Sequence, residues 1–246
     1  MLRRRDLLIT TTIILIAWQI TAMLIQRDIL PTPVQVASAI FTDFGALSRH
    51  FIASTLRVVI SIIIAVILAV PAGLAMGQMP RLNHIFSPVA YIIYPIPKIV
   101  FLPIILLFFG ATDLSKVLII VLILFFQILV PVRDDAAGIR PELLNSVKSL
   151  GAGRRALFRF VYLPASLPAV LTSLRLSIGT AVAVLYITET TATSLGLGYY
   201  IYLNASTLFN YPATYAGAVA MGVLGLLLYF FIDWLEKRVC RWRFVT

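Results

Sequence analysis

The sequence predicts an all-α membrane protein with six transmembrane helices. Of its 246 residues, 61% are hydrophobic and only 12% are charged, and the mean hydropathy is +0.99. This composition excludes a water-soluble domain of the same size. Six apolar runs are each long enough to cross about 30 Å of hydrocarbon. Within a single membrane domain over residues 1–246, they cover about residues 7–25, 53–76, 85–109, 114–132, 165–188 and 213–232.

The basic residues outside these runs indicate the orientation of the chain. If both termini are cytoplasmic, nearly all of them face the cytosol, from Arg3 near the start to Arg243 near the end, and only Arg27 and Arg49 face outward. Positive residues concentrate on the cytoplasmic side of membrane proteins, so this orientation is favoured. It also accounts for the net charge of +10 without nucleic acid as a partner. The start MLRRRDLL fits a cleaved or twin-arginine signal as well, but the length of the first run and the five later runs favour a membrane helix.

Two outer segments are predicted to lie at the membrane surface. The first, LPTPVQVASAIFTDF, begins with two prolines that fix an extended entry. Apolar side chains then recur at helical spacing, which predicts an interfacial helix, at Val34, Ala37, Ile40, Phe41 and Phe44. The second segment follows Glu189, carries no charge and is rich in tyrosine, which predicts a re-entrant or interfacial loop at headgroup level.

The second run carries a glycine pair and a charge. Gly73 and Gly77 form a GxxxG pattern, which permits close approach either of a helix of the same chain or of another subunit. Arg57 lies near the outer end of this run, and Glu189 lies at the outer end of the fifth run. Because a lone charge inside a bilayer is costly, we predict a structural ion pair between Arg57 and Glu189.

The third run is interrupted by prolines. YIIYPIPKIVFLP places Pro95, Pro97 and Pro103 inside a membrane segment, where each removes a backbone donor. The freed carbonyls need protein or water, which places the segment beside a cavity rather than against lipid. The ammonium of Lys98 lies at the same depth in the membrane and likewise requires a protein partner or water. This favours a translocation pathway over the alternative of a kinked packing helix, and the residues assigned to the pathway are Tyr94, Pro95, Pro97, Lys98 and Arg175.

The loop 133–164 predicts a short amphipathic helix between the fourth and fifth runs. Pro141 stands at the first position of this helix, and Gly151 stands where a left-handed residue would end it. Its apolar stripe consists of Leu143, Leu144, Val147 and Leu150. A cytosolic partner and an anionic lipid surface would each bury such a stripe beside a basic face.

The spacing after this helix carries a family resemblance. Gly151 is followed after nine residues by Val161, and then by Leu163 and Pro164. This pattern resembles the cytoplasmic loop of ABC importer permeases, whose motif runs EAA, three residues, Gly, nine residues, Ile, one residue, Leu-Pro. LPTPVQVASAIF, STLRVVIS, YPIPKIVFLPIILLFFG and SLGLGYYI, in this order, look like the permeases of nitrate, sulfonate and taurine importers. The resemblance extends from Leu30 to about Tyr202.

The resemblance implies a type I ABC importer permease of the bacterial inner membrane, a transport subunit without catalytic activity. Two permeases, commonly identical, would form the pore, and an extracytoplasmic solute-binding protein would deliver the solute. Two separate ATP-binding subunits would hold ATP-Mg, so that this chain binds no cofactor itself. The coupling helix would contact those subunits through Glu142, Leu143, Asn145, Ser146, Val147, Leu150, Gly151, Leu163 and Pro164. Asn145, Ser146 and Val147 stand in the EAA positions, so the acidic residue of the motif is replaced.

Other classes of function fit the sequence less well. A single cysteine and two histidines indicate neither a disulfide nor a metal site, and no set of nucleophile and base converges. The chain has no GxxxxGK element and so is not itself the ATPase. An ATP-independent secondary transporter or channel is the alternative, although no inverted repeat is evident. Arg57, Lys98 and Arg175 would suit an anion, so a sulfonate, nitrate or similar oxyanion is the expected solute.

Overall fold

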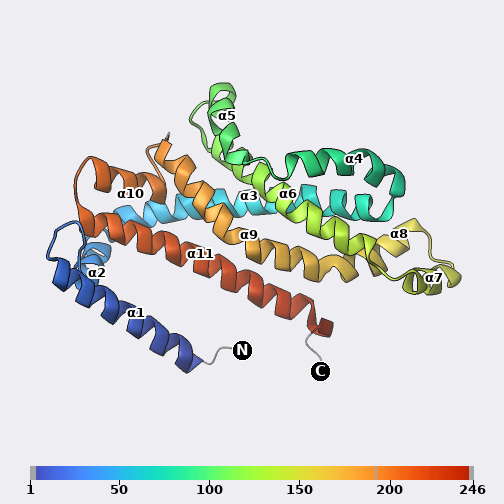
Figure 1. The fold of residues 1–246 in the computed structure, drawn as a ribbon, viewed down its shortest axis with the longest axis horizontal. Coiled ribbons are helices and arrows are strands. Elements are labelled where there is room, and N and C mark those ends of the chain that lie inside the picture. The colour runs from blue at the N-terminus through green and yellow to red at the C-terminus, as the bar shows by residue number, and fades with distance from the viewer. Residues whose placement is uncertain (1–3, 192, 244–246) are drawn as a thin grey trace. The chain divides into compact units, whose positions relative to one another are not determined.

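The computed structural model describes residues 4–191 and 193–243, and all regular elements in these residues are helices (Figure 1). The basic residue Arg3 lies outside the described residues. Five helices are long and apolar enough to cross a membrane, and a bent pair makes a sixth crossing if it is counted as one span. The five are α1 (Arg4–Ile25), α3 (Phe44–Gln78), α6 (Asp113–Ala137), α9 (Leu163–Thr191) and α11 (Tyr211–Val239). The bent pair is α4 (Pro80–Ile93) followed by the 3₁₀ turn η1 (Lys98–Phe101) and α5 (Leu102–Phe109).

Shorter helices connect the long ones. All six predicted apolar runs lie within the long helices and the bent pair, and the short helices predicted after Pro33 and after Pro141 are present as α2 and α7. The short elements are α2 (Pro33–Thr42), α7 (Pro141–Ser149), α8 (Arg154–Leu157), the π-helix η2 (Phe158–Tyr162), α10 (Leu197–Ser206) and the 3₁₀ turn η3 (Arg241–Arg243).

The chain divides into two compact units. The first contains Met1–Thr55 and Glu189–Leu224, and the second contains Leu56–Thr188 and Gly225–Thr246. Helices α3, α9 and α11 contribute residues to both units. The single domain over residues 1–246 stays a prediction.

In the first unit, local sequence fixes the entry to α2. The Thr32 hydroxyl accepts the backbone N–H of Gln35, and the Gln35 side chain accepts the N–H of Thr32 at 2.8 Å, which forms a capping box. Pro33 occupies the first turn, where its missing N–H costs nothing. Trp18 of α1 donates its indole N–H to the Pro31 carbonyl at 3.0 Å. The side chain of Leu24 on α1 is 79% exposed, as suits a helix in contact with lipid.

In the second unit, the glycine pair of α3 packs against α6. A Cβ atom on Gly77 would lie 2.6 Å from the Arg133 carbonyl oxygen and 2.7 Å from the Ala136 Cβ. A Cβ atom on Gly73 would lie 2.9 Å from the Leu129 carbonyl oxygen. These distances are too short for any side chain, so only glycine allows the two helices to approach this closely. Of the two partners that the sequence left open, the structure shows a helix of the same chain.

The break in the third predicted run is sharp. Helix α4 ends at Ile93, and the axis of η1 with α5 is turned by 84° from that of α4. Pro95 and Pro97 lie in the connection, so the change of direction falls where the prolines remove backbone donors.

Candidate functional site

Lys98 satisfies the carbonyl groups at the break. Its ammonium donates hydrogen bonds to the carbonyl oxygens of Tyr94 at 2.8 Å, Ile93 at 3.1 Å and Ile96 at 3.2 Å. Pro97 stands four residues after Ile93, where a helix would supply an N–H to the Ile93 carbonyl, and proline has none. A cation at the carboxyl end of a helix is also favoured by the helix dipole. The buried ammonium therefore has a structural role at the break.

Two cavities of the second unit meet near this break. The smaller, of about 320 Å³, is lined by Lys98 and by the ring of Phe126, whose centroid lies 5.0 Å from the Lys98 ammonium. The larger, of about 810 Å³, extends along α9 and reaches Asp135 and Trp242. Tyr94 and Gln127 line both cavities. The break thus lies beside cavities, as its prolines predicted, and the pathway role of Tyr94, Pro95, Pro97 and Lys98 remains a prediction.

Hydroxyl groups on α9 give these cavities a polar wall. The lining of the larger cavity includes Thr172, Ser173 and Ser177, and that of the smaller includes Thr180. The hydroxyls of Ser173 and Ser177 donate to carbonyls one turn earlier in α9, at 2.7 and 2.8 Å, which leaves their oxygen lone pairs as acceptors. Sequence reasoning missed this wall, although the serine and threonine spacing along the fifth apolar run was the signal that could have shown it.

Arg175 forms ion pairs with α11. Its guanidinium lies 3.2 Å from an Asp233 oxygen and 3.2 Å from a Glu236 oxygen. Arg175 is not among the described residues that line either cavity, and its pathway role remains a prediction. Asp233 and Glu236 were missed because the predicted sixth run ended at Ile232, one residue before the first of them.

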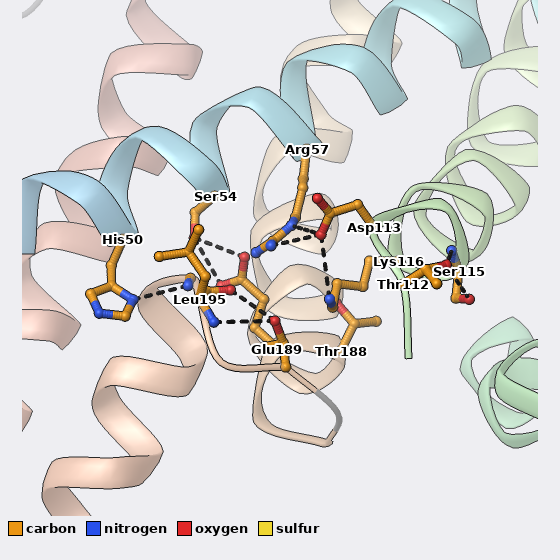
Figure 2. A network of polar contacts seen from close by, with 12 residues as sticks. His50, Ser54, Arg57, Thr112, Asp113, Ser115, Lys116, Thr188, Glu189 and Leu195 are labelled. Carbon is orange, nitrogen blue, oxygen red and sulfur yellow. Dashed lines mark hydrogen bonds and ion pairs between the residues drawn. The ribbon is translucent and has the colours of Figure 1, made fainter. Parts of the chain in front are cut away.

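Arg57 bonds an acidic residue that sequence reasoning also missed. Its guanidinium contacts one Asp113 oxygen through two nitrogens, at 2.7 and 2.9 Å, and the Lys116 ammonium lies 3.5 Å from the same oxygen (Figure 2). Asp113 opens α6, and Arg57 and Lys116 are both buried. Glu189 belongs to the other unit, so its ion pair with Arg57 stays a prediction.

In the first unit, the Glu189 carboxylate holds the start of α10. Its oxygens accept the hydroxyl of Ser54 at 2.8 Å and the backbone N–H of Gly198 at 2.9 Å (Figure 2). Ser54 in turn accepts the N–H of Leu197 at 2.8 Å, and His50 accepts the N–H of Gly196 at 3.0 Å through Nδ1. A carboxylate at a helix amino terminus satisfies free donors and favours the helix dipole.

The same short helix is tied to the end of α2, where Asp43 is the C-cap. The Tyr200 hydroxyl donates to Asp43 at 3.0 Å, and burial together with this carboxylate raises the pKa of Tyr200, so the phenol stays protonated and keeps donating. Gly196 has a φ of 133°, a conformation that side chains other than glycine rarely adopt. These bonds explain why the uncharged SLGLG stretch folds back on the chain.

The predicted loop helix is present as α7 and ends as its sequence indicates. Gly151 has a φ of 81°. Its N–H bonds the Lys148 carbonyl at 2.9 Å, and the N–H of Ala152 bonds the Val147 carbonyl at 3.4 Å. These two bonds form a Schellman motif, which satisfies the last carbonyls of the helix.

The apolar stripe of α7 is only partly covered by the described part of the chain, and Leu144 and Val147 are half-buried. Leu143 is 47% exposed and Leu150 is 86% exposed. The polar side of the helix is occupied by Glu142, Asn145 and Ser146, all of them exposed. Leu163 and Pro164 of the same predicted set open α9. The structure therefore places the predicted coupling residues on one loop, with an apolar surface open to a partner.

The fold is helical, with several helices long enough to cross a membrane, cavities with a wall of hydroxyl groups beside a broken span, and an exposed amphipathic loop helix. These features define the class as a membrane transport protein. The chain belongs to the family of binding-protein-dependent transport system inner membrane components, whose model matches residues 61–241. It is thus a permease subunit of an ABC importer and a multi-pass protein of the inner membrane, and it is similar to permeases of the nitrate, sulfonate and taurine group.

Individual relatives and a solved structure agree with this family. The taurine transport system permease protein TauC of Escherichia coli K12 is 29% identical over 95% of this chain and 88% of its own length. The formylaminopyrimidine transport permease protein ThiX of Halalkalibacterium halodurans is 29% identical over 94% of this chain and 92% of its own. A chain of the inward-facing MetNI methionine ABC transporter matches the fold with a TM-score of 0.66 at 18% identity, over 80% of this chain and 97% of that one. The type I permease architecture is therefore confirmed.

Proposed function

We propose that two copies of this chain form the pore of an ATP-driven importer and that α7 is the helix through which ATP-binding subunits move it. The observation that carries this proposal is the exposed stripe of Leu143 and Leu150 on a helix whose end is well fixed. An apolar stripe of this kind on a folded loop requires a partner surface. Two ATP-binding subunits, one for each copy, would hold ATP-Mg, and this chain would bind no cofactor.

The connections of α7 show how a movement would reach the cavities. At one end, α7 follows α6, which carries Gln127, and at the other end it leads through α8 and η2 into α9, which carries Ser173 and Ser177. These three side chains line the larger cavity. A displacement of α7 by its partner would therefore act on both helices that form the polar wall, which is how ATP-driven closure would alternate access to the pathway.

The basic residues support an orientation with both termini in the cytoplasm. The loop that contains α7 would then face the ATP-binding subunits, and α2 and α10 would face the external solute-binding protein. This arrangement follows the positive-inside rule, because the predicted outer segments contain few basic residues.

For the solute, we propose a small oxyanion that also carries hydrogen-bond donors. The expectation of a sulfonate, nitrate or similar oxyanion is supported by the similarity of the chain to the taurine transport system permease protein. The larger cavity adds the acceptor oxygens of Ser173 and Ser177 and the carboxylate of Asp135, and no lysine or arginine is among the described residues that line it. The buried Oε1 of Gln127 has no hydrogen-bond partner within the described residues. An aminosulfonate such as taurine would offer donors to these oxygens.

Co-purification tests the coupling proposal. The chain is co-expressed with the ATP-binding subunit encoded nearest to its gene and purified in mild detergent. Three versions are compared: wild type, Leu150→Asp and the control Arg140→Gln, which removes an exposed charge from the same loop. We expect wild type and control to retain a stoichiometric ATPase and Leu150→Asp to lose it. If wild type retains none, an ATP-independent transporter or channel becomes the better description.

A matched pair of solutes tests the substrate proposal. Taurine and 2-hydroxyethanesulfonate share a sulfonate, but taurine carries an amine where 2-hydroxyethanesulfonate carries a hydroxyl. Uptake into proteoliposomes that contain the assembled importer should be faster for taurine, and Gln127→Leu should reduce the difference. Equal uptake of the two sulfonates, with no change in Gln127→Leu, would contradict the role of the acceptor groups and leave the coupling proposal intact.

A further inference from the structure

A second surface feature of the second unit lies apart from the cavities that Gln127 lines. It is a groove of about 820 Å³ between the end of α3, the start of α4 and the loop helices. We name it the loop groove. Its lining residues are Leu74, Ala75, Gln78, Met79, Pro80, Arg81, Lys148, Leu157, Phe158 and Tyr162.

The floor of the loop groove is apolar. Leu74 of α3 and Leu157 of α8 are 1% and 5% exposed, and they form its buried part. Met79 and Phe158 are 48% and 41% exposed at its sides. Phe158 opens the π-helix η2, a type of distortion that occurs frequently at functional sites. An apolar channel with an open side fits a hydrocarbon chain.

The charge of the loop groove has one sign. Arg81 on α4 and Lys148 on α7 line it, and no aspartate or glutamate is among its described lining residues. Both side chains are exposed, and neither forms an ion pair or a hydrogen bond within the described part of the chain. Two cations without internal partners beside an apolar floor are complementary to a ligand with an anionic head and an apolar tail.

The loop groove lies at the level where a membrane-spanning helix leaves the bilayer. Its floor begins in the last residues of α3, where an apolar helix long enough to span the bilayer ends at Gln78. The two cations lie on the elements that follow this end and on the loop. In the orientation proposed above, this edge is the cytoplasmic one, where anionic lipids attract basic residues by about 1 kcal/mol for each.

We infer that the loop groove binds one anionic phospholipid, with the phosphate between Arg81 and Lys148 and an acyl chain along Leu74, Leu157 and Phe158. Because Lys148 belongs to α7 and Arg81 to α4, the bound lipid would brace the loop helix against the membrane helices. The apolar stripe at Leu143 and Leu150 is not part of this groove, so a lipid here and an ATP-binding subunit on α7 do not exclude each other.

Native mass spectrometry of the full chain in detergent tests this inference. The protein is titrated with dioleoylphosphatidylglycerol and with dioleoylphosphatidylcholine, which share their acyl chains and differ in net charge. We expect tighter binding of the anionic lipid, and a loss of about fivefold in its affinity for each of Arg81→Gln and Lys148→Gln, or about 25-fold in the double variant. The matched control is the double variant Arg140→Gln and Arg155→Gln, which removes the same charge from exposed positions outside the groove and should change the affinity less than twofold.

Four results would contradict the inference. An equal loss of lipid affinity in the control double variant would show a general attraction of the lipid to a basic loop. An equal affinity for the two lipids would show that the groove does not distinguish an anionic headgroup from a neutral one. Displacement of the lipid by equimolar glycerol phosphate would show a phosphate site without a lipid tail. A photoreactive acyl chain on phosphatidylglycerol adds a measurement on the unmodified protein, and we expect it to label the peptide that contains Leu157–Tyr162; labelling elsewhere alone would contradict the proposed placement.

Discussion

The hydroxyl of Ser54 lies 2.8 Å from both carboxylate oxygens of Glu189. The two residues are separated by 135 positions in the sequence, and both are fully buried. Ser54 also accepts the N–H of Leu197, so one small side chain joins α3 to the carboxylate and to the first turn of α10. The fold of the segment that leads into α10 thus depends on a serine in the first third of an apolar helix.

Replacing this serine tests its structural role. Ser54→Ala removes the donor to Glu189 and the acceptor for Leu197, and it leaves buried polar groups that cost about 1–3 kcal/mol when unsatisfied. We expect a lower midpoint of thermal unfolding in detergent and faster proteolysis between Glu189 and Leu197. The control is Ser48→Ala, since the Ser48 hydroxyl bonds a carbonyl within its own helix. Equal melting of Ser54→Ala and wild type would contradict the proposed role of this network.

The glycine pair of α3 gives a second prediction. Gly77→Ala would place a methyl group 2.6 Å from the Arg133 carbonyl oxygen, so α3 and α6 must move apart. Such overpacking typically costs about 1–3 kcal/mol. Gly179→Ala on α9 is the matched control, because nothing lies within 4 Å of its Cβ position, and there alanine should be neutral or stabilising by up to about 1 kcal/mol. Thermal unfolding of the two variants in the same detergent tests both expectations, a lower stability for Gly77→Ala and an equal or higher stability for Gly179→Ala. If Gly77→Ala is as stable as wild type, the close contact is refuted.

Much of this fold could be predicted because local chemistry decides it. Apolar length fixed the position of each membrane helix, and the prolines at 95 and 97 located the break. The limits of α7 followed from Pro141 and Gly151, since one residue favours the first turn of a helix and the other its left-handed end. These features depend on neighbours in the sequence, so a pattern is sufficient to find them.

The partners of the buried charges could not be predicted in the same way. Depth predicted a pair between Arg57 and Glu189, which stays a prediction, but it did not indicate Asp113, which opens α6 and lies 2.7 Å from Arg57. Arg175 was assigned to the pathway, and its partners Asp233 and Glu236 lay beyond the predicted end of the last run. Depth in the membrane gives one coordinate of a side chain, whereas a partner also depends on the rotation and neighbours of each helix.

Lys98 gives a prediction that separates capping from anion attraction. Lys98→Arg keeps the positive charge but replaces a compact ammonium, whose three protons meet three carbonyls, with a planar group that does not fit the same geometry. If the role of Lys98 is to bond the carbonyl groups at the break, both Lys98→Arg and Lys98→Met should lower the unfolding temperature. If it serves only to attract an anion, Lys98→Arg should melt like wild type and keep the KM for the solute. We expect the first result, because the ammonium is already bonded to the backbone.

The ion pairs of Arg175 give a prediction for α9 and α11. Arg175→Met removes the Arg175 cation from the carboxylate of Glu236, which is 2% exposed, and breaking a buried pair in this way typically costs about 3–5 kcal/mol. Glu236→Gln in addition removes the buried negative charge that Arg175 faced, so the double variant should be more stable than Arg175→Met alone. Thermal unfolding of wild type, both single variants and the double variant gives the coupling energy. Additive losses would show that the two residues do not stabilise each other, and Arg175 would then be free to serve the pathway to which its sequence position first assigned it.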